Sequence, residues 1–122
     1  MEINIFICLQ KFCLFIIARY LGNQIYSYNQ FLSFDLRTGE EDGRASVVDI
    51  VLEGSGQRVS SAIFTQGNNM PSIETNNYKF RLHEHKNYQW TPPINSQDFL
   101  TILSNLTAIK IRATYNNEGI LY

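Results

Sequence analysis

The sequence predicts an all-β fold, built on an antiparallel sheet with one short helix, and three observations support this class. Two strand-like segments flank a glycine-containing turn within residues 46–64. Aromatic residues, mainly Tyr and Phe, make up 13% of the chain and fit the pleated surface of a sheet. Within the expected domain, helical spacing of apolar residues is confined to residues 95–107.

The segment 46–64 is expected to form a central β-hairpin. One face of its first arm carries Val48, Ile50 and Leu52, and the other carries Val47, Asp49 and Val51. Because of Asp49, the second face is expected to be the wetter one. Gly54 and Gly56 are expected to supply the positive φ angles of the turn. On the return arm Val59, Ser61 and Ile63 alternate with Arg58, Ser60 and Ala62. Nothing in this hairpin suggests catalysis.

Length and charge limit the possible functions. The 122 residues, 44% of them hydrophobic, correspond to one domain that can bury a core without disulfides or metal. The net charge of -1 and an isoelectric point near 6.1 give no electrostatic reason to expect a nucleic-acid partner or an acidic lipid surface.

The first 20 residues form an apolar segment that fits no standard targeting signal. Gln10 and Lys11 interrupt it near the middle, so we expect no membrane insertion. It lacks the basic start and the small-residue cleavage site of a signal peptide. Cys8 and Cys13 match no zinc or redox spacing, and we interpret them as free, incidental thiols.

Two further strands are expected on either side of the hairpin, each identified by alternation. Their inward residues are Leu32, Phe34 and Leu36 in the first strand and Tyr78, Phe80 and Leu82 in the second. The acidic segment 38–44 is interpreted as a solvated loop, because it lacks the ligand spacing of an EF-hand. The segment 66–75 is a second polar loop, since Pro71 excludes it from a central strand.

The segment 83–93 combines two histidines, a glutamate and a tryptophan. His83 and His85 lack the i, i+4 spacing that places metal ligands on one helix face, and on a strand Glu84 would point away from both. We therefore interpret the histidines as a solvated rim and expect no metal or cofactor. Trp90 is expected to plug the end of a sandwich rather than to stack on a sugar.

The last elements are a helix and a strand. Residues 95–107 have a cap at Asn95 or Ser96, Asp98 at the positive end of the helix dipole, and apolar side chains at helical spacing: Phe99, Ile102, Leu103 and Leu106. This helix is expected to lie across one end of the sheets. In the strand 108–115 the inward residues are Ile109, Ile111, Ala113 and Tyr115, and the outward ones are Lys110, Arg112 and Thr114.

These passages carry a family resemblance. The segments 21–37, 47–72, 78–84, 88–92 and 99–115 resemble, in collinear order, laminin domain IV of type A, also called the laminin B domain, and most closely that of laminin gamma chains. The resemblance implies a β-sandwich of jelly-roll type over residues 21–122. Residues 1–20 match poorly, and the domain is expected to be incomplete at both ends, with truncation at its C-terminus.

The resemblance implies a non-enzymatic structural module of a secreted, basement-membrane laminin-like chain that supports matrix assembly and cell adhesion. Its partners would be other laminin chains or matrix proteins. The alternative is a glycan-binding sandwich, which would need Trp90 or several tyrosines exposed together, beside polar side chains such as Asn68, Asn69 or Gln89. A hydrolase is not supported, because no nucleophile lies in a recognisable elbow. Asn105, in Asn105-Leu106-Thr107, is the one N-glycosylation motif.

Overall fold

The computed structural model describes residues 2–9, 20–38, 49–63 and 74–111, with side chains from residue 20 onward and not for residues 36–38. Most of the loops 38–44 and 66–75, and the expected inward residues Val48, Ala113 and Tyr115, lie outside these ranges. In chain order the elements are β1 (Glu2–Leu9), the 3-10 turn η2 (Ile25–Ser27), β2 (Phe31–Thr38), β3 (Ile50–Gly54), β4 (Gln57–Ser61), β5 (Asn76–Arg81), the 3-10 turn η4 (Lys86–Tyr88), α1 (Ser96–Ser104) and β6 (Leu106–Ile111).

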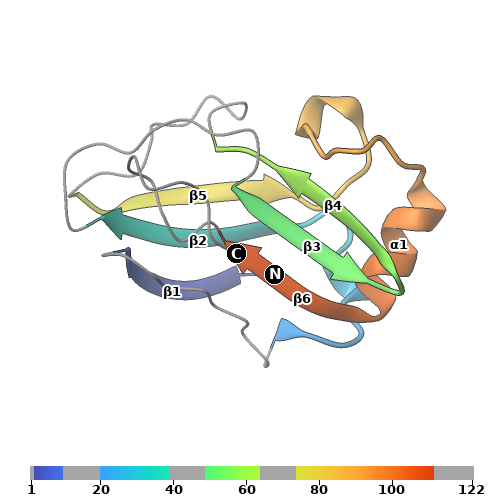
Figure 1. Cartoon of the computed structure of the whole chain (residues 1–122), viewed down its shortest axis with the longest axis horizontal. Helices are drawn as coiled ribbons and strands as arrows, with labels where there is room; N and C mark the ends of the chain where they lie inside the picture. Colours follow the sequence, from blue (N-terminus) through green and yellow to red (C-terminus); the bar gives the residue numbers. More distant parts are fainter. Residues whose placement is uncertain (1, 10–19, 39–48, 64–73, 112–122) are drawn as a thin grey trace.

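The strands form two three-stranded sheets, in the orders β1-β2-β5 and β4-β3-β6 (Figure 1). All pairings are antiparallel except that of β1 with β2, which is parallel. The all-β, antiparallel sandwich class with one short helix is thereby confirmed. Six strands are described, whereas a jelly roll has eight, so the jelly-roll connectivity stays a prediction.

One hydrophobic core lies between the sheets, because the inward residues of both belong to the same buried cluster. The first sheet contributes Leu32, Phe34, Tyr78 and Phe80, and the second contributes Ile50, Leu52, Val59, Ile109 and Ile111. These positions follow the two-residue period of a strand, which is why the alternation predicted most of them. Lys79 on β5 faces water, whereas Lys110 on β6, which was expected to point outward, is half-buried.

The hairpin of β3 and β4 confirms the predicted core residues Ile50, Leu52 and Val59 but not the predicted wet face. Leu52 pairs with Val59 and Ile50 with Ser61, and all but Ser61 are fully buried. The expectation of a wetter face in the first arm was wrong, because Val51 is fully buried and so is Asp49, with 0% exposure. Its Oδ2 accepts a hydrogen bond of 2.6 Å from the backbone N–H of Ile63. The carboxylate therefore closes the open end of the hairpin.

The turn itself differs from the prediction at one glycine. Positive φ angles occur at Ser55 and Gly56, at 51° and 75°, and not at Gly54. Two central residues with positive φ are typical of a type I′ hairpin turn. Gly54 is required for a different reason: a Cβ atom there would collide with the backbone oxygen of Ile102 and lie 2.7 Å from that of Asn105. The glycine allows α1 to approach the hairpin closely.

Helix α1 lies at one end of the sandwich, beside the turn between β3 and β4 (Figure 1). Its predicted cap is confirmed, since the side chain of Asn95 accepts a hydrogen bond of 2.8 Å from the N–H of Asp98. The helix ends at Ser104, earlier than predicted. Leu106 is buried as expected but begins β6, where it forms an isolated bridge with Gly22.

The apolar N-terminal segment includes β1, which the sequence did not identify as a strand. It pairs with β2 in parallel, with Cys8 opposite Arg37 and Leu9 opposite Thr38. Parallel strands are joined by a long connection, so no turn motif in the sequence marks the pairing of β1 with β2. Cys13 lies outside the described residues.

Candidate functional sites at the helix end and the sheet surface

The glycosylation motif lies at the junction between α1 and β6. Asn105 is the C-cap of the helix, and its side chain is exposed, as is that of Thr107. Leu106 between them is buried. Because Asn105 and Thr107 are exposed on either side of the buried Leu106, both side chains face solvent. The position is sterically open to a glycan.

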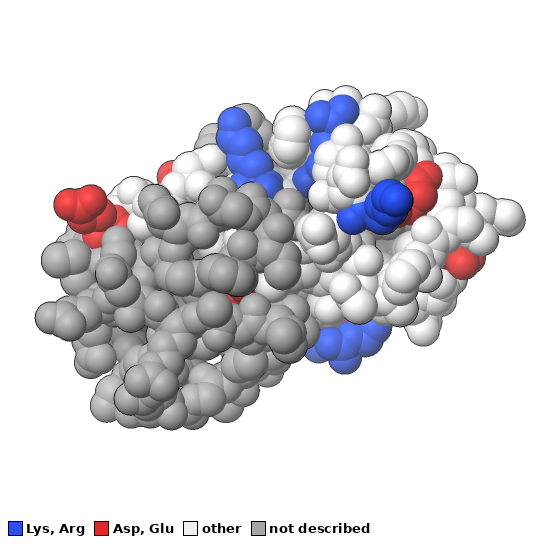
Figure 2. Space-filling view, turned by 90° about the horizontal axis from the view of Figure 1, so that it is seen from above, with Lys and Arg blue, Asp and Glu red and all other residues white. Residues whose placement is uncertain are grey.

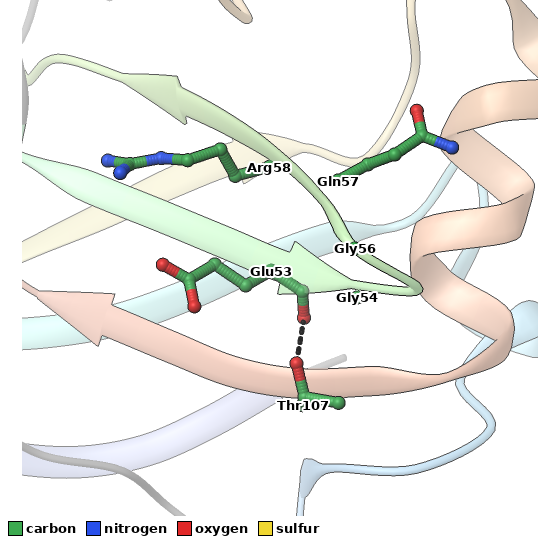
Figure 3. Close-up of a pocket in the computed structure, with 6 residues that line it drawn as sticks. All are labelled: Glu53, Gly54, Gly56, Gln57, Arg58 and Thr107. Atoms are coloured by element: carbon green, nitrogen blue, oxygen red, sulfur yellow. Dashed lines mark hydrogen bonds between the residues drawn. The ribbon is translucent and has the colours of Figure 1, made fainter.

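A shallow, open hollow of about 220 Å³ adjoins this motif on the outer face of the sheet β4-β3-β6. Its lining residues are Glu53, Gly54, Gly56, Gln57, Arg58 and Thr107 (Figure 3). The hydroxyl of Thr107 donates a hydrogen bond of 3.1 Å to the backbone oxygen of Glu53. The carboxylate of Glu53 forms a 2.9 Å ion pair with Lys110 on β6. No pattern in the sequence indicates this hollow, because its residues meet only when β3, β4 and β6 pair.

A second polar cluster joins the segment before β2 to the histidine region. The hydroxyl of Tyr28 lies 2.5 and 2.7 Å from the two carboxylate oxygens of Glu84. Burial, the hydrogen bond to Glu84 and the negative charge of Glu84 raise the pKa of Tyr28 to about 12. This link spans 56 positions in sequence, so no local pattern could have revealed it.

The same cluster corrects the predicted orientation of Glu84. Residues 83–85 follow β5 and are not part of a strand, so side chains there do not alternate. Glu84 approaches within 3.0 Å of Nδ1 of His83 instead of pointing away from it. His83 also lies against the ring of Tyr28, with 5.3 Å between centroids. His83 is therefore half-buried between neighbours, and His85 is exposed as expected for a rim residue.

Trp90 belongs to the core, as predicted. It is only 7% exposed, and its ring packs against Phe80 and Phe99 at centroid distances of 6.0 and 5.9 Å. The indole N–H donates a hydrogen bond of 2.7 Å to the backbone oxygen of Arg81. Trp90 is thus unavailable as a sugar platform. Tyr26, at 94% exposure, is the most exposed large hydrophobic residue described.

The described surface gives no further sign of a reactive or charged site. On the face shown in Figure 2, the Lys and Arg side chains of described residues stand apart and do not form a continuous patch. Within the described ranges, no three His, Cys, Asp or Glu side chains gather as metal ligands would. No helix in those ranges is long and apolar enough to cross a membrane.

Comparisons with known proteins agree with this architecture. Residues 16–120 match the family described as Laminin B (Domain IV). The chain is a member of the laminin B domain family. It is 48% identical over 105 residues to human laminin subunit gamma-1, and 42% identical over 105 residues to human laminin subunit gamma-2. The laminin-like protein lam-2 of Caenorhabditis elegans is 44% identical over 105 residues. No solved structure matches.

The matched region is a small part of these relatives. The alignments cover 85–86% of this chain but only 6% of laminin subunit gamma-1 and of lam-2, and 9% of laminin subunit gamma-2. The laminin B domain of this chain therefore corresponds to one module of much longer proteins.

Proposed function

We propose that this laminin B domain is a non-enzymatic structural module of a secreted, basement-membrane laminin-like chain. Its role is to space and present neighbouring modules, and so to support matrix assembly and cell adhesion. Other laminin chains and matrix proteins are the partners of the parent molecule. The observation that carries this proposal is the 48% identity with human laminin subunit gamma-1 over 86% of the chain.

The physical character of the domain supports a mechanical role. Its two sheets share a single dense core, and side-chain links such as that from Tyr28 to Glu84 join segments far apart in sequence. A module that holds its neighbours at a fixed separation must keep its shape under load, and a common core gives it that property.

A glycan-binding role has less support. Such a site needs aromatic rings exposed together beside polar groups. Trp90, which motivated this alternative together with the tyrosines, is buried in the core, and Asn68 and Asn69 lie outside the described residues. The structural role is therefore the function that we propose.

Asn105 is proposed as an N-glycosylation site of the secreted domain. Its side chain is exposed and flanked by an outward Thr107, and a glycan there would add bulk and solubility. The mass of the 122-residue chain, secreted from a eukaryotic host behind a signal peptide, should fall on treatment with a glycosidase. An unchanged mass would contradict this assignment, and Asn105→Gln is the matched control.

Localisation tests the structural role. Antibodies against the recombinant domain should stain thin extracellular sheets beneath epithelia in tissue of the source organism, and antibody absorbed with the domain should give no stain. Detergent-free extraction should leave the antigen in the insoluble matrix. Staining confined to the cell interior would contradict the proposal.

A further inference from the structure

The hollow on the outer sheet shares one residue with the proposed glycosylation motif. Thr107 belongs both to the glycosylation motif and to the lining of the hollow. Asn105 and Thr107 are exposed on either side of the buried Leu106. A group attached to Asn105 therefore starts two residues along the chain from the edge of this hollow.

The hollow has the surface that a sugar ring requires. Gly54 and Gly56 leave part of its floor free of side chains, and no atom lies within 4 Å of the place where a Cβ of Gly56 would stand. Figure 3 shows the side chains of Gln57 and Arg58 extending from β4 in opposite directions, with Glu53 on β3 and Thr107 on β6. A guanidinium, an amide and a carboxylate can donate to and accept from sugar hydroxyls and an acetamide group.

A covalent link between the sugar and Asn105 would compensate for the weak binding expected at so open a hollow. A shallow polar hollow without aromatic rings would bind a free sugar poorly. A sugar linked covalently to Asn105 is held nearby at a high effective concentration, so a weak contact suffices.

We propose that this hollow seats the first N-acetylglucosamine of a glycan linked to Asn105, with Gly56 beneath the ring and Arg58 at its side. This inference rests on the proposed glycosylation of Asn105. It adds that the innermost sugar packs on the sheet and does not project freely into solvent. The glycan would then cover the turn between β3 and β4.

The test is an NMR measurement on the isotope-labelled 122-residue chain, secreted from a eukaryotic host and trimmed with an endoglycosidase to one N-acetylglucosamine. Nuclear Overhauser contacts are expected between the sugar and both the Hα atoms of Gly56 and the side chain of Arg58. In Arg58→Ala the remaining contacts to Gly56 should weaken several-fold. In Lys79→Ala, which removes a matched exposed charge from the other sheet, they should be unchanged.

The possible failures are distinguishable. Mass spectrometry that finds Asn105 unmodified overturns the proposed glycosylation and this inference with it. A modified Asn105 whose sugar contacts only its own side chain overturns the seat alone and leaves the glycosylation intact. Equal contacts to Gly56 in the Arg58→Ala and Lys79→Ala variants overturn the role of Arg58 in the seat.

Discussion

Single residues close the two ends of the β3 and β4 hairpin by different physical means. At the turn, Gly54 is small enough to let the backbone of α1 pass over the strand. At the open end, the buried carboxylate of Asp49 accepts the N–H of Ile63, continuing the ladder that the bond from Asp49 N–H to the Ser61 oxygen begins. A buried N–H without a partner would cost free energy comparable to a lost hydrogen bond.

Gly54→Ala is expected to destabilise the domain by about 2–3 kcal/mol. The added methyl group meets backbone oxygens of Ile102 and Asn105, and backbone cannot rotate away as a side chain can, so the cost lies at the upper end for overpacking. Urea unfolding measures the loss. Gly56→Asn is the control: the space above Gly56 is open and Asn tolerates positive φ, so its cost should stay below about 1 kcal/mol.

Asp49→Ala is expected to lower the free energy of unfolding by about 2–3 kcal/mol, because it leaves the N–H of Ile63 buried without this acceptor. The matched control is Asp35→Ala. Asp35 accepts a 2.8 Å hydrogen bond from Asn77 near the surface, and its removal should cost at most about 0.5 kcal/mol. Equal losses in the two variants would show that the burial of Asp49 contributes nothing.

Tyr28 should make the domain sensitive to alkaline pH. Its pKa of about 12 in the fold lies above the value of about 10 for an unfolded chain, so folding favours the neutral phenol. That contribution is complete below about pH 10 and is lost as the pH rises towards 12. Tyr28→Phe should therefore lose less stability than the wild type between pH 10 and 12. Identical losses across this window, in denaturant titrations at each pH, would refute the assignment.

Among the elements, α1 depends most on its cap and its contact with β3. It has only 9 residues, too few to be stable alone in water. Phe99, Ile102 and Leu103 are buried and tie it to the sandwich. The side-chain cap at Asn95 adds stability to a helix that is already stabilised by packing against the sandwich.

Asn95→Ala should cost about 1 kcal/mol, the usual value for losing a side-chain cap. Asn95→Asp, which keeps an oxygen acceptor for the N–H of Asp98, should retain most of the stability. Thermal unfolding followed by circular dichroism compares the two. Gln97→Ala, at an exposed helix position, controls for general effects of substitution in the first turn, and a loss there equal to that of Asn95→Ala would argue against the cap.

Elements specified by residues close together in the chain could be predicted from the sequence. Features that depend on contacts between distant segments could not. Alternation identified β2, β3, β4, β5 and β6, and the capping pattern identified the start of α1. The end of α1 was placed too late because Leu106 is buried equally well on a helix or a strand. The parallel pairing of β1, the purpose of Gly54 and the burial of Asp49 all depend on segments that meet only in the fold.

The same distinction applies to the candidate sites: those formed by neighbouring residues could be recognised in the sequence, and those formed by distant segments could not. Asn105 was recognisable because its motif is three consecutive residues, and the burial of Trp90 followed from its apolar ring. The hollow beside Asn105 draws on β3, β4 and β6, and the contact of Tyr28 with Glu84 crosses 56 positions. Neither has a spacing that a reader of the sequence could recognise.

At the scale of the whole molecule, the central claim is that the two sheets form one mechanical unit around a shared core. Leu52 on β3 and Phe80 on β5 belong to the same buried cluster although they lie in different sheets. Trp90 packs on Phe80 and so reports on the sheet that does not contain Leu52. A substitution that destabilises one sheet should therefore also shift the unfolding midpoint that a probe in the other sheet reports.

The most direct test is equilibrium unfolding of Leu52→Ala, followed by both Trp90 fluorescence and far-ultraviolet circular dichroism. Removing the buried side chain should cost about 2–5 kcal/mol, and both probes should report the same displaced midpoint, as expected for one cooperative unit. Lys79→Ala, exposed on β5, should leave both midpoints in place. A Trp90 transition that stays at the wild-type midpoint while the circular dichroism transition moves would contradict the shared core.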